Sequence, residues 1–376
     1  MIKRAISNQI TSRLFRKKAI VILGARQVGK TTLVNSIASE YRDDSIYWNG
    51  EEPDIRDIVS GATSTKLKAQ IGNKNLVIID EAQKIPGIGQ SMKLIIDNYP
   101  DIQLIATGSS SFELSGQTSE PLTGRKYEFH LFPLSFSEMV KHTSLIEEKR
   151  MLEHRMLYGY YPGIVNEAGD EKLLLSMITE SYLYKDIFSW GLIKKPLVLE
   201  KLVQALALQV GNELSYHELG QLVGADNETV ERYIDLLEKS FVVFRLQSLN
   251  RNLRNEIKKS KKIYFWDNGI RNAVIRNFSP LNLRTDTGAL WENYMITEII
   301  KQKMNRGHFF NKWFWRTHAQ QEIDFITEQD GKITALEFKW SKRKKHQMPV
   351  SFQQAYENSR FYTVTPENYN EFLVND

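Results

Sequence analysis

The sequence of 376 residues contains no cysteine. A disulfide framework, a thiolate zinc site and a cysteine nucleophile are therefore excluded, and the composition fits a reducing cytosol. The sequence also lacks any apolar run close to the roughly 18 residues that a membrane-spanning helix needs. Its first 18 residues carry basic side chains but no long apolar core of the kind found in signal peptides. We therefore expect a cytoplasmic protein with no membrane partner.

The length allows about two to four domains with a sizeable core. The formal net charge of +5 is modest, but the basic residues are clustered. Two clusters, at residues 251–262 and 339–346, predict a footprint for the phosphate backbone of DNA, with binding that depends on salt rather than on base sequence. Ordinary solvated loops are the alternative.

An apolar run that breaks into glycine, lysine and threonine is the most specific motif. The stretch "VILGARQVGKTT" matches G-x-x-x-x-G-K-[ST], with a predicted strand over 19–23 before it and a predicted helix after it. In this motif the backbone N–H groups surround phosphate oxygens, the lysine reaches the β- and γ-phosphates, and the threonine hydroxyl binds Mg²⁺. The predicted nucleotide-binding residues are Gly24, Ala25, Arg26, Gln27, Val28, Gly29, Lys30, Thr31 and Thr32.

Two further apolar runs end in polar residues. Residues 76–79 read as a buried parallel strand followed by Asp80 and Glu81, which is the Walker B pattern. Asp80 is expected to hold Mg²⁺ together with Thr31, and Glu81 to orient and deprotonate the attacking water. A third strand ends at Thr107 and Ser109 and could lie between the other two, where either hydroxyl could position that water; a helix cap is the alternative.

The middle of the chain predicts helices and then a mixed segment. Residues 134–208 have helical periodicity and would form a lid over the nucleotide. From residue 212, two helices flank a turn at 224–226 and a β-rich segment follows, which is a winged-helix pattern. A DNA reader would present residues 227–232 to a groove, but Glu228 and Glu231 would repel phosphates, so packing between domains is the alternative. His217 is expected to be a surface or packing residue.

The C-terminal part carries acids in the order of a PD-(D/E)xK nuclease. Glu292 lies on a predicted helix, Asp324 on a strand, and Glu337 and Lys339 two apart on the next strand, so the last two share a face. A hairpin turn at residues 330–331 can bring Asp324 beside them. Asp324 and Glu337 could hold Mg²⁺, and Lys339 could orient or deprotonate water. Charge pairs on a strand face are common, so cleavage does not follow from the motif alone.

These motifs together resemble a family of bacterial and archaeal AAA+ ATPases, in which the core is followed by a winged helix and a restriction-endonuclease-like domain of unknown function. The resemblance runs nearly end to end. Tyr160 departs from the glycine that is usual before Tyr-Pro. The markers are "GARQVGKTTL", "VIIDEAQKIP", "ATGSSS", "LTGRKYEFHLFPLSFSE", "YGYYPGIV", "YLYKDI", "KIYFWDNGIR" and "EIDFITEQDGKITALEFKWS".

The resemblance implies ATP as the nucleotide. The sequence itself contains no Asn-Lys-x-Asp motif, which would read guanine, so the identity of the base is inferred chiefly from the resemblance. It also implies an oligomer such as a hexameric AAA+ ring, in which Arg125, just before the last core strand, reaches the neighbouring subunit's site. A surface arginine is the alternative.

The expected fold is α/β, with a P-loop AAA+ parallel-sheet core at 1–133, a helical lid at 134–208, a winged helix with a basic wing at 209–262, and a PD-(D/E)xK-like domain at 263–376. The expected function is ATP hydrolysis coupled to action on DNA, with a possible metal-dependent nuclease. The rival is a nucleotide-driven regulatory switch whose C-terminal domain binds a protein.

Overall fold

The computed structural model describes residues 1–108, 122–180, 195–250, 260–317, 319–341 and 347–374. The chain forms two compact units. The first unit comprises Met1–Pro133 with Lys239–Phe241, and the second comprises Leu134–Glu238 with Val242–Asp376. The division of residues 134–376 into a helical lid, a winged helix and a C-terminal domain stays a prediction.

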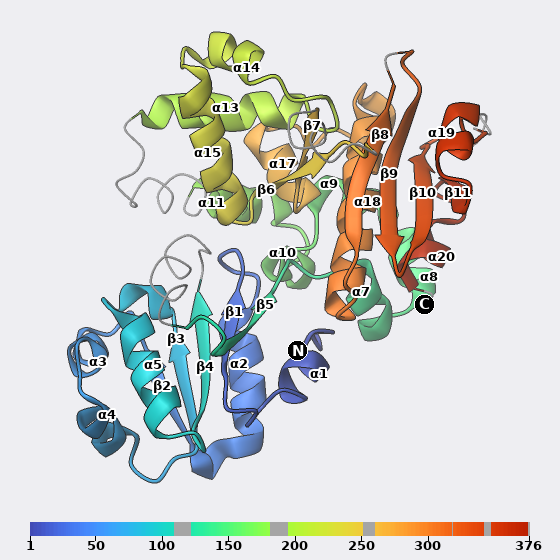
Figure 1. Ribbon diagram of the computed structural model, residues 1–376. Coiled ribbons are helices and arrows are strands. Elements are labelled where there is room, and N and C mark those ends of the chain that lie inside the picture. The colour runs from blue at the N-terminus through green and yellow to red at the C-terminus, as the bar shows by residue number, and fades with distance from the viewer. Residues whose placement is uncertain (109–121, 181–194, 251–259, 318, 342–346, 375–376) are drawn as a thin grey trace. The chain divides into compact units, whose positions relative to one another are not determined.

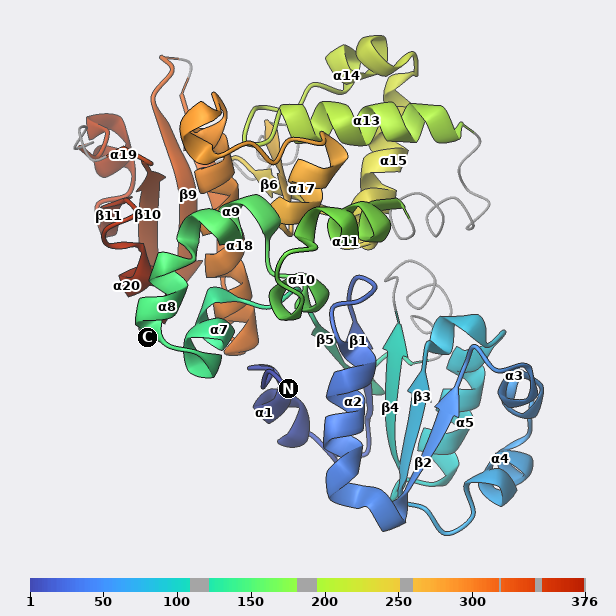
Figure 2. The same ribbon diagram turned by 180° about the vertical axis from the view of Figure 1, so that it is seen from behind.

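The first unit is built on a five-stranded parallel sheet in the order β2-β3-β4-β1-β5. Its inner strands are short apolar runs buried along their whole length, as expected when helices cover both faces of a parallel sheet. Figures 1 and 2 show α2 against one face and α5 against the other. The strands are β1 (Ala19–Leu23), β2 (Ser45–Asn49), β3 (Leu76–Asp80), β4 (Gln103–Gly108) and β5 (Lys126–His130).

The helices of this unit mostly lie between successive strands, so that each crossover returns the chain to the same edge of the sheet. They are α1 (Ser7–Thr11), α2 (Lys30–Ala38), α3 (Pro53–Val59), α4 (Ser64–Ile71) and α5 (Ile88–Asn98), with 3-10 turns at Ser39–Asp44 and Ala82–Lys84. The third strand of the sequence analysis, β4, pairs with β1 on one side and β3 on the other, which confirms the predicted order.

The second unit begins with helices, and between residues 134 and 208 the described residues form helices and no strand. This agrees with the predicted helical character of the segment. The helices are α7 (Phe136–His142), α8 (Leu145–Arg150), α9 (Leu152–Tyr158), α10 (Pro162–Asn166), α11 (Glu171–Ile178) and α13 (Pro196–Leu208). The marker "YLYKDI" lies outside the described residues.

A helix–turn–helix and a two-stranded antiparallel ribbon follow. They consist of α14 (Tyr216–Val223), α15 (Asn227–Lys239), β6 (Val243–Gln247) and β7 (Lys261–Phe265). Gly224 ends α14 in the left-handed conformation, with φ of 72°, which explains a glycine at the predicted turn. That these elements form a winged helix stays a prediction.

The C-terminal part is a four-stranded mixed sheet with the order β11-β10-β9-β8. The long helix α18 (Thr287–Asn305) runs beside this sheet in both views (Figures 1 and 2) and contacts β10. The strands are β8 (Asn311–Arg316), β9 (Glu322–Gln329), β10 (Lys332–Phe338) and β11 (Ser359–Val364), and the remaining helices are α17 (Asn268–Val274), a 3-10 turn (Leu281–Leu283), α19 (Val350–Ala355) and α20 (Tyr369–Val374).

The motif around Tyr160 is part of the packed interior of the second unit. Tyr160 is buried, and its hydroxyl lies 3.2 Å from that of Tyr294 and 3.3 Å from Oε2 of Glu148. The Tyr160 backbone N–H donates to Asp267 at 2.7 Å, and a Cβ at Gly159 would collide with the same carboxylate. The markers "YGYYPGIV" and "KIYFWDNGIR" therefore contact each other in the interior of this unit.

Candidate functional sites

The phosphate loop occupies the turn between β1 and α2. Gln27 and Gly29 have positive φ angles of 60° and 94°, and α2 begins at Lys30. A Cβ at Gly24 would collide with the carbonyl oxygen of Leu131, in the segment after β5. The requirement for glycine at position 24 thus comes from the neighbouring backbone.

Lys30 lies inside this loop. Its side chain is 4% exposed, and Nζ donates to the carbonyl oxygens of Gly24 at 3.0 Å and Ala25 at 2.8 Å. Burial lowers the pKa of Lys30 to about 8, although Glu81 and Asp80 act in the opposite direction. A polyanion in the loop would stabilise the charged form of this lysine.

Three hydroxyl groups donate to the Asp80 carboxylate at the carboxyl end of β3. Thr31 lies 2.7 Å and Tyr47 2.5 Å from Oδ2, and Thr107 donates to Oδ1. Asp80 is 4% exposed, so these donors satisfy a carboxylate that water barely reaches. Burial and the hydrogen bond to Asp80 raise the pKa of Tyr47, which keeps its hydroxyl a donor. The predicted pair of Thr31 and Asp80 is brought together.

Glu81 follows in a left-handed conformation, with φ of 50°. Its backbone N–H donates to Oγ1 of Thr107 at 3.0 Å, and its Oε2 accepts from the Gln83 amide at 2.5 Å. Thr107 is fully buried, and its hydroxyl joins Asp80 and Glu81. The structure therefore places Thr107 as a support for both acids. Ser109, its predicted alternative, lies outside the described residues.

Arg125 is not part of its own chain's phosphate site. It precedes β5, whose first residue pairs with Ala19 at the start of β1, whereas the phosphate loop follows the end of β1. Its Nε is 2.7 Å from Oδ1 of Asp97, and both side chains are more than a third exposed. Arg26, inside the loop, lies 4.0 Å from Glu51.

The sequence analysis missed three residues at this site. Tyr47 comes from the edge strand β2, Gln83 contacts Glu81, and Arg4 donates to the carbonyl oxygen of Val28 in the phosphate loop at 2.7 Å. The parallel pairing of Asn49 with Asp80 is what brings β2 to Walker B. Arg4 stands before the first helix, with no local pattern that points to the loop.

The second site is the acidic end of the β9–β10 hairpin. Asp330 and Gly331 form its turn with φ angles of 51° and 74°, and β9 and β10 pair antiparallel, as the sequence predicts. An Asp324 oxygen accepts from the backbone N–H of Phe338 at 2.7 Å. Nζ of Lys339 lies 2.6 Å from Oε1 of Glu337. Asp324, Glu337 and Lys339 are therefore neighbours.

Glu292 on α18 joins this cluster together with Lys262, which the sequence analysis placed in a basic wing. Lys262 is 2% exposed; its Nζ is 3.4 Å from Oε1 of Glu292 and also contacts Glu322. The Tyr264 hydroxyl donates to Oε1 of Glu292 at 2.6 Å. Alternation along β7 could have shown that residues 262 and 264 share a face, but not that this face meets α18.

Burial dominates the electrostatics of this acidic cluster. It raises the pKa of Glu292 to about 7, assisted by Asp324, and that of Asp324 to about 7, assisted by Glu337. The pKa of Glu337 is raised for the same reason. Burial alone would lower the pKa of Lys339, but Asp324 and Glu337 raise it. Glu292 and Asp324 therefore titrate near neutral pH, and a bound cation would displace their protons.

Among the described residues, no group of three or more histidines, aspartates and glutamates has an arrangement that could hold a metal ion. The two acids expected to bind Mg²⁺ in the C-terminal part are close, but they are not a complete cation site by themselves.

Within the same described ranges, no helix is both long enough and apolar enough to cross a membrane.

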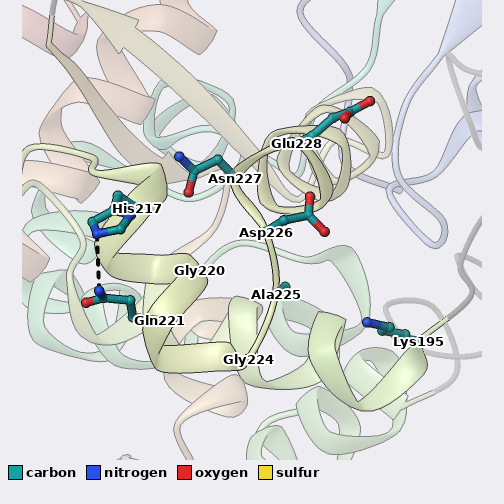
Figure 3. A pocket seen from close by; sticks show the side chains of 9 residues that line it. All are labelled: Lys195, His217, Gly220, Gln221, Gly224, Ala225, Asp226, Asn227 and Glu228. Carbon is teal, nitrogen blue, oxygen red and sulfur yellow. Dashed lines mark hydrogen bonds between the residues drawn. The ribbon is translucent and has the colours of Figure 1, made fainter.

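The helix–turn–helix carries an open pocket of about 780 Å³ at its turn (Figure 3). Lys195 and His217 line it together with Asp226 and Glu228, so basic and acidic residue types are mixed. The Gln221 amide donates to the His217 ring at 3.1 Å, and His217 is exposed, as the surface alternative predicts for this histidine. Most of the basic segment 251–262 and residues 342–346 lie outside the described residues.

Three protein families match successive parts of the chain. Residues 16–140 match a family described as AAA domain, residues 149–281 a Domain of unknown function (DUF8612), and residues 287–375 a Domain of unknown function (DUF4143). An uncharacterized protein of Haemophilus influenzae is 24% identical over 83% of this chain and 80% of its own length. One of Methanocaldococcus jannaschii is 23% identical over 99% of this chain and 88% of its own length.

Solved structures give weaker similarities. Pif1 helicase from Candida albicans has a TM-score of 0.28 at 14% identity, over 47% of this chain and 48% of its own. Drosophila ORC bound to AT-rich DNA and Cdc6 has a TM-score of 0.23 at 10% identity, over 72% and 91%. At such TM-scores neither bears on function. The matched family and the geometry of the phosphate loop agree: residues 16–140 form an AAA-type P-loop domain, followed by two regions that match domains of unknown function.

Proposed function

We propose that the chain binds and hydrolyses ATP in its first unit. The observation that carries the proposal is the hydrogen bond of 2.7 Å between Thr31 and Asp80, which joins the phosphate loop to Walker B. Thr107 connects the same carboxylate to Glu81. The loop, the Walker B acid and the adjacent glutamate are the parts that ATP hydrolysis requires.

The oxygen donors of Thr31 and Asp80 fit Mg²⁺, a hard cation that prefers carboxylate and hydroxyl oxygens. Bound Mg²⁺ would neutralise charge on the β- and γ-phosphates during transfer. Lys30 would leave its carbonyl partners for the phosphates, and the N-terminus of α2 would add its positive dipole. Glu81, held by Gln83, would orient the attacking water and accept its proton.

Two substitutions separate binding from hydrolysis. Lys30→Ala removes the charge that faces the phosphates, so we expect the Kd for ATP to rise by about tenfold or more. Glu81→Gln keeps the size of the side chain but removes the carboxylate that acts as the base, so binding should persist while kcat falls by about a hundredfold or more. Isothermal titration and a phosphate-release assay would measure the two effects.

Glu40→Gln serves as the control, because Glu40 is exposed on the turn after α2. If Glu81→Gln hydrolyses ATP at the parent rate while Lys30→Ala is inactive, Glu81 is not the base.

We further propose that turnover is coupled to DNA in a homo-oligomer such as a hexameric ring. Support comes from the order of the motifs and from the basic residues within 251–259 and 342–346 of the sequence, because neighbouring cations favour a polyanion. Lys262 and Lys339, at the ends of the two clusters, pair with acids and are not part of this support. The acids in the helix–turn–helix pocket favour the rival, a nucleotide-driven switch with a protein partner. Stimulation of turnover by duplex, single-stranded or branched DNA supports the first. Nucleotide-dependent assembly that is indifferent to DNA supports the second.

A second candidate activity is metal-dependent cleavage of phosphodiesters by a PD-(D/E)xK-like site. It is favoured by the contact of 2.6 Å between Lys339 and Glu337 beside the buried Asp324. Asp324 and Glu337 supply oxygen donors that suit Mg²⁺, and Glu292 supports them. The cation would lower the pKa of the attacking water, and Lys339 would orient that water or take its proton.

For this site we expect the parent to cut at least one form of DNA with Mg²⁺ or Mn²⁺. Glu337→Ala removes a cation ligand and Lys339→Ala removes the group that handles the water, so each should lower cleavage by about a hundredfold or more. A gel assay on duplex, single-stranded and branched DNA measures this.

Lys332→Ala is the matched control, because Lys332 lies exposed at the start of the same strand. A broad substrate screen without cutting, together with unchanged DNA binding by both variants, would leave the domain with the residues of a nuclease but not the chemistry.

A further inference from the structure

Arg4 is a buried arginine that contacts the phosphate loop from outside the motif. It is 8% exposed and stands before α1. Its Nη1 donates to the carbonyl oxygen of Val28, and its Nη2 to that of Phe132, both at 2.7 Å. Hydrogen bonds from a guanidinium are strong and directional, because its donors have a fixed planar arrangement.

The hydrogen bond from Arg4 to the Val28 carbonyl affects the orientation of the next peptide N–H, which is that of Gly29. In a trans peptide the C=O and N–H bonds point in opposite directions. A Val28 carbonyl held towards Arg4 therefore directs the Gly29 N–H away from Arg4. Gly29 has a φ of 94° and is followed by the first residue of α2, so its N–H belongs to the group of donors that surround phosphates in such loops.

The contact with Phe132 fixes the other side of the guanidinium. Phe132 lies in the segment after β5, where the Leu131 N–H donates to Leu23 at 2.7 Å and the Leu131 carbonyl approaches Gly24 closely. The beginning of the phosphate loop is thus packed against Leu131, and its end is connected through Arg4 to Phe132. The positions of both ends of the phosphate loop therefore depend on the backbone of Leu131 and Phe132.

We infer that Arg4 is a positioning residue of the nucleotide site: it orients the Gly29 N–H towards the phosphates of a nucleoside di- or triphosphate. The inference rests on the proposed binding of ATP. Arg4 acts through the Val28–Gly29 peptide, whose N–H it also polarises, because a hydrogen bond to the carbonyl strengthens the donor at the other end of the peptide.

The test measures the Kd of MgADP, which excludes turnover, for Arg4→Ala, Arg4→Lys and the control Arg16→Ala. Arg16 is an exposed arginine of the same N-terminal segment. We expect Arg4→Ala to raise the Kd by about tenfold to a hundredfold, the loss that removal of a hydrogen bond from a charged donor produces. The Kd of Arg4→Lys should lie between those of Arg4→Ala and the parent, because lysine keeps the positive charge but not the two fixed N–H donors of the guanidinium.

A structural role alone would lower the Tm of the nucleotide-free protein and leave the Kd unchanged. A positioning role predicts a smaller Tm increase on adding MgADP, and recovery of MgADP affinity in Arg4→Ala when methylguanidinium is added. If Arg4→Ala does not fold, the Kd of Arg4→Lys for MgADP tests the inference in its place. A parent that does not bind MgADP overturns the proposed function and this inference with it. A parent that binds, beside folded Arg4 variants with the parent Kd, overturns this inference alone.

Discussion

Three hydroxyl groups, from Thr31, Tyr47 and Thr107, donate to one buried carboxylate, Asp80. A buried carboxylate without donors would be costly, so the three hydroxyls offset the burial of this side chain. Thr107 differs from the other two because it also accepts from the Glu81 backbone. One threonine therefore fixes the positions of the expected metal ligand and the expected base.

Thr107→Val tests this role. Valine has a similar shape but no hydroxyl, so the Glu81 N–H loses its acceptor and Asp80 loses a donor. We expect the free energy of unfolding to fall by about 1–3 kcal/mol. We also expect kcat for ATP to fall by about tenfold, because small displacements of catalytic groups are costly, while KM changes little.

Thr107→Ser keeps the hydroxyl and should retain most of the parent kcat. Urea unfolding and steady-state kinetics would give the three values for each variant. A parent-like kcat in Thr107→Val would mean that the hydroxyl supports the fold but not the reaction.

Among the secondary-structure elements, the inner strands of the first unit were predictable and their polar neighbours were not. β1, β3 and β4 are buried along their whole length and have apolar centres because helices cover both faces of the sheet, and the residues that bear the chemistry lie at or just beyond their carboxyl ends. Tyr47 lies on β2, of which only Trp48 is buried, and the partner strand of β2 is set by tertiary pairing. No local pattern near Arg4 indicates a contact with Val28 across the fold.

The same distinction holds in the C-terminal part. The turn at Asp330 and Gly331 is local, so the β9–β10 hairpin and the approach of Asp324 to Glu337 follow from sequence. Lys262 is distant in sequence and lies in a run of basic residues, so its burial against Glu292 was not predicted. A run of basic residues suggests solvent exposure, but in a strand each side chain points to one of two faces. A basic residue on the covered face is buried, as Lys262 is.

α18 shows how one helix serves both packing and the acidic cluster. Glu298 and Lys301 form a buried ion pair of 2.7 Å, in which Lys301 also donates to the carbonyl oxygen of Leu134 and Glu298 accepts from the N–H of Phe136. Glu292, on the same helix, belongs to the acidic cluster. Helical periodicity predicts such a helix, but which of its charged residues are buried depends on the backbone groups that they meet.

On the scale of the whole molecule, the position of Arg125 relative to the phosphate loop favours action between subunits. In parallel strands of five residues the two ends are about 13–17 Å apart, and Arg125 and the phosphate loop lie at opposite ends of the paired strands β5 and β1. Its ion pair with Asp97 is partly exposed and therefore contributes little, so assembly could replace it at small cost. An arginine at this edge could reach a γ-phosphate bound to another copy of the chain.

Mixing two inactive variants tests this arrangement. We expect Arg125→Ala and Glu81→Gln each to lower hydrolysis strongly, because one removes the arginine supplied to the neighbour and the other removes the base. In a mixed assembly, an interface that combines the intact Glu81 of one chain with the intact Arg125 of the next should be active. With random mixing in a ring of head-to-tail interfaces, roughly a quarter of the sites have this combination, so the phosphate-release rate should rise well above that of either variant alone. Mixing Arg125→Ala with a chain that carries both substitutions is the control, because every site then lacks either the arginine or the base. Absence of recovery in the first mixture, with co-assembly demonstrated by pull-down of differently tagged chains, would return Arg125 to the role of a surface residue paired with Asp97.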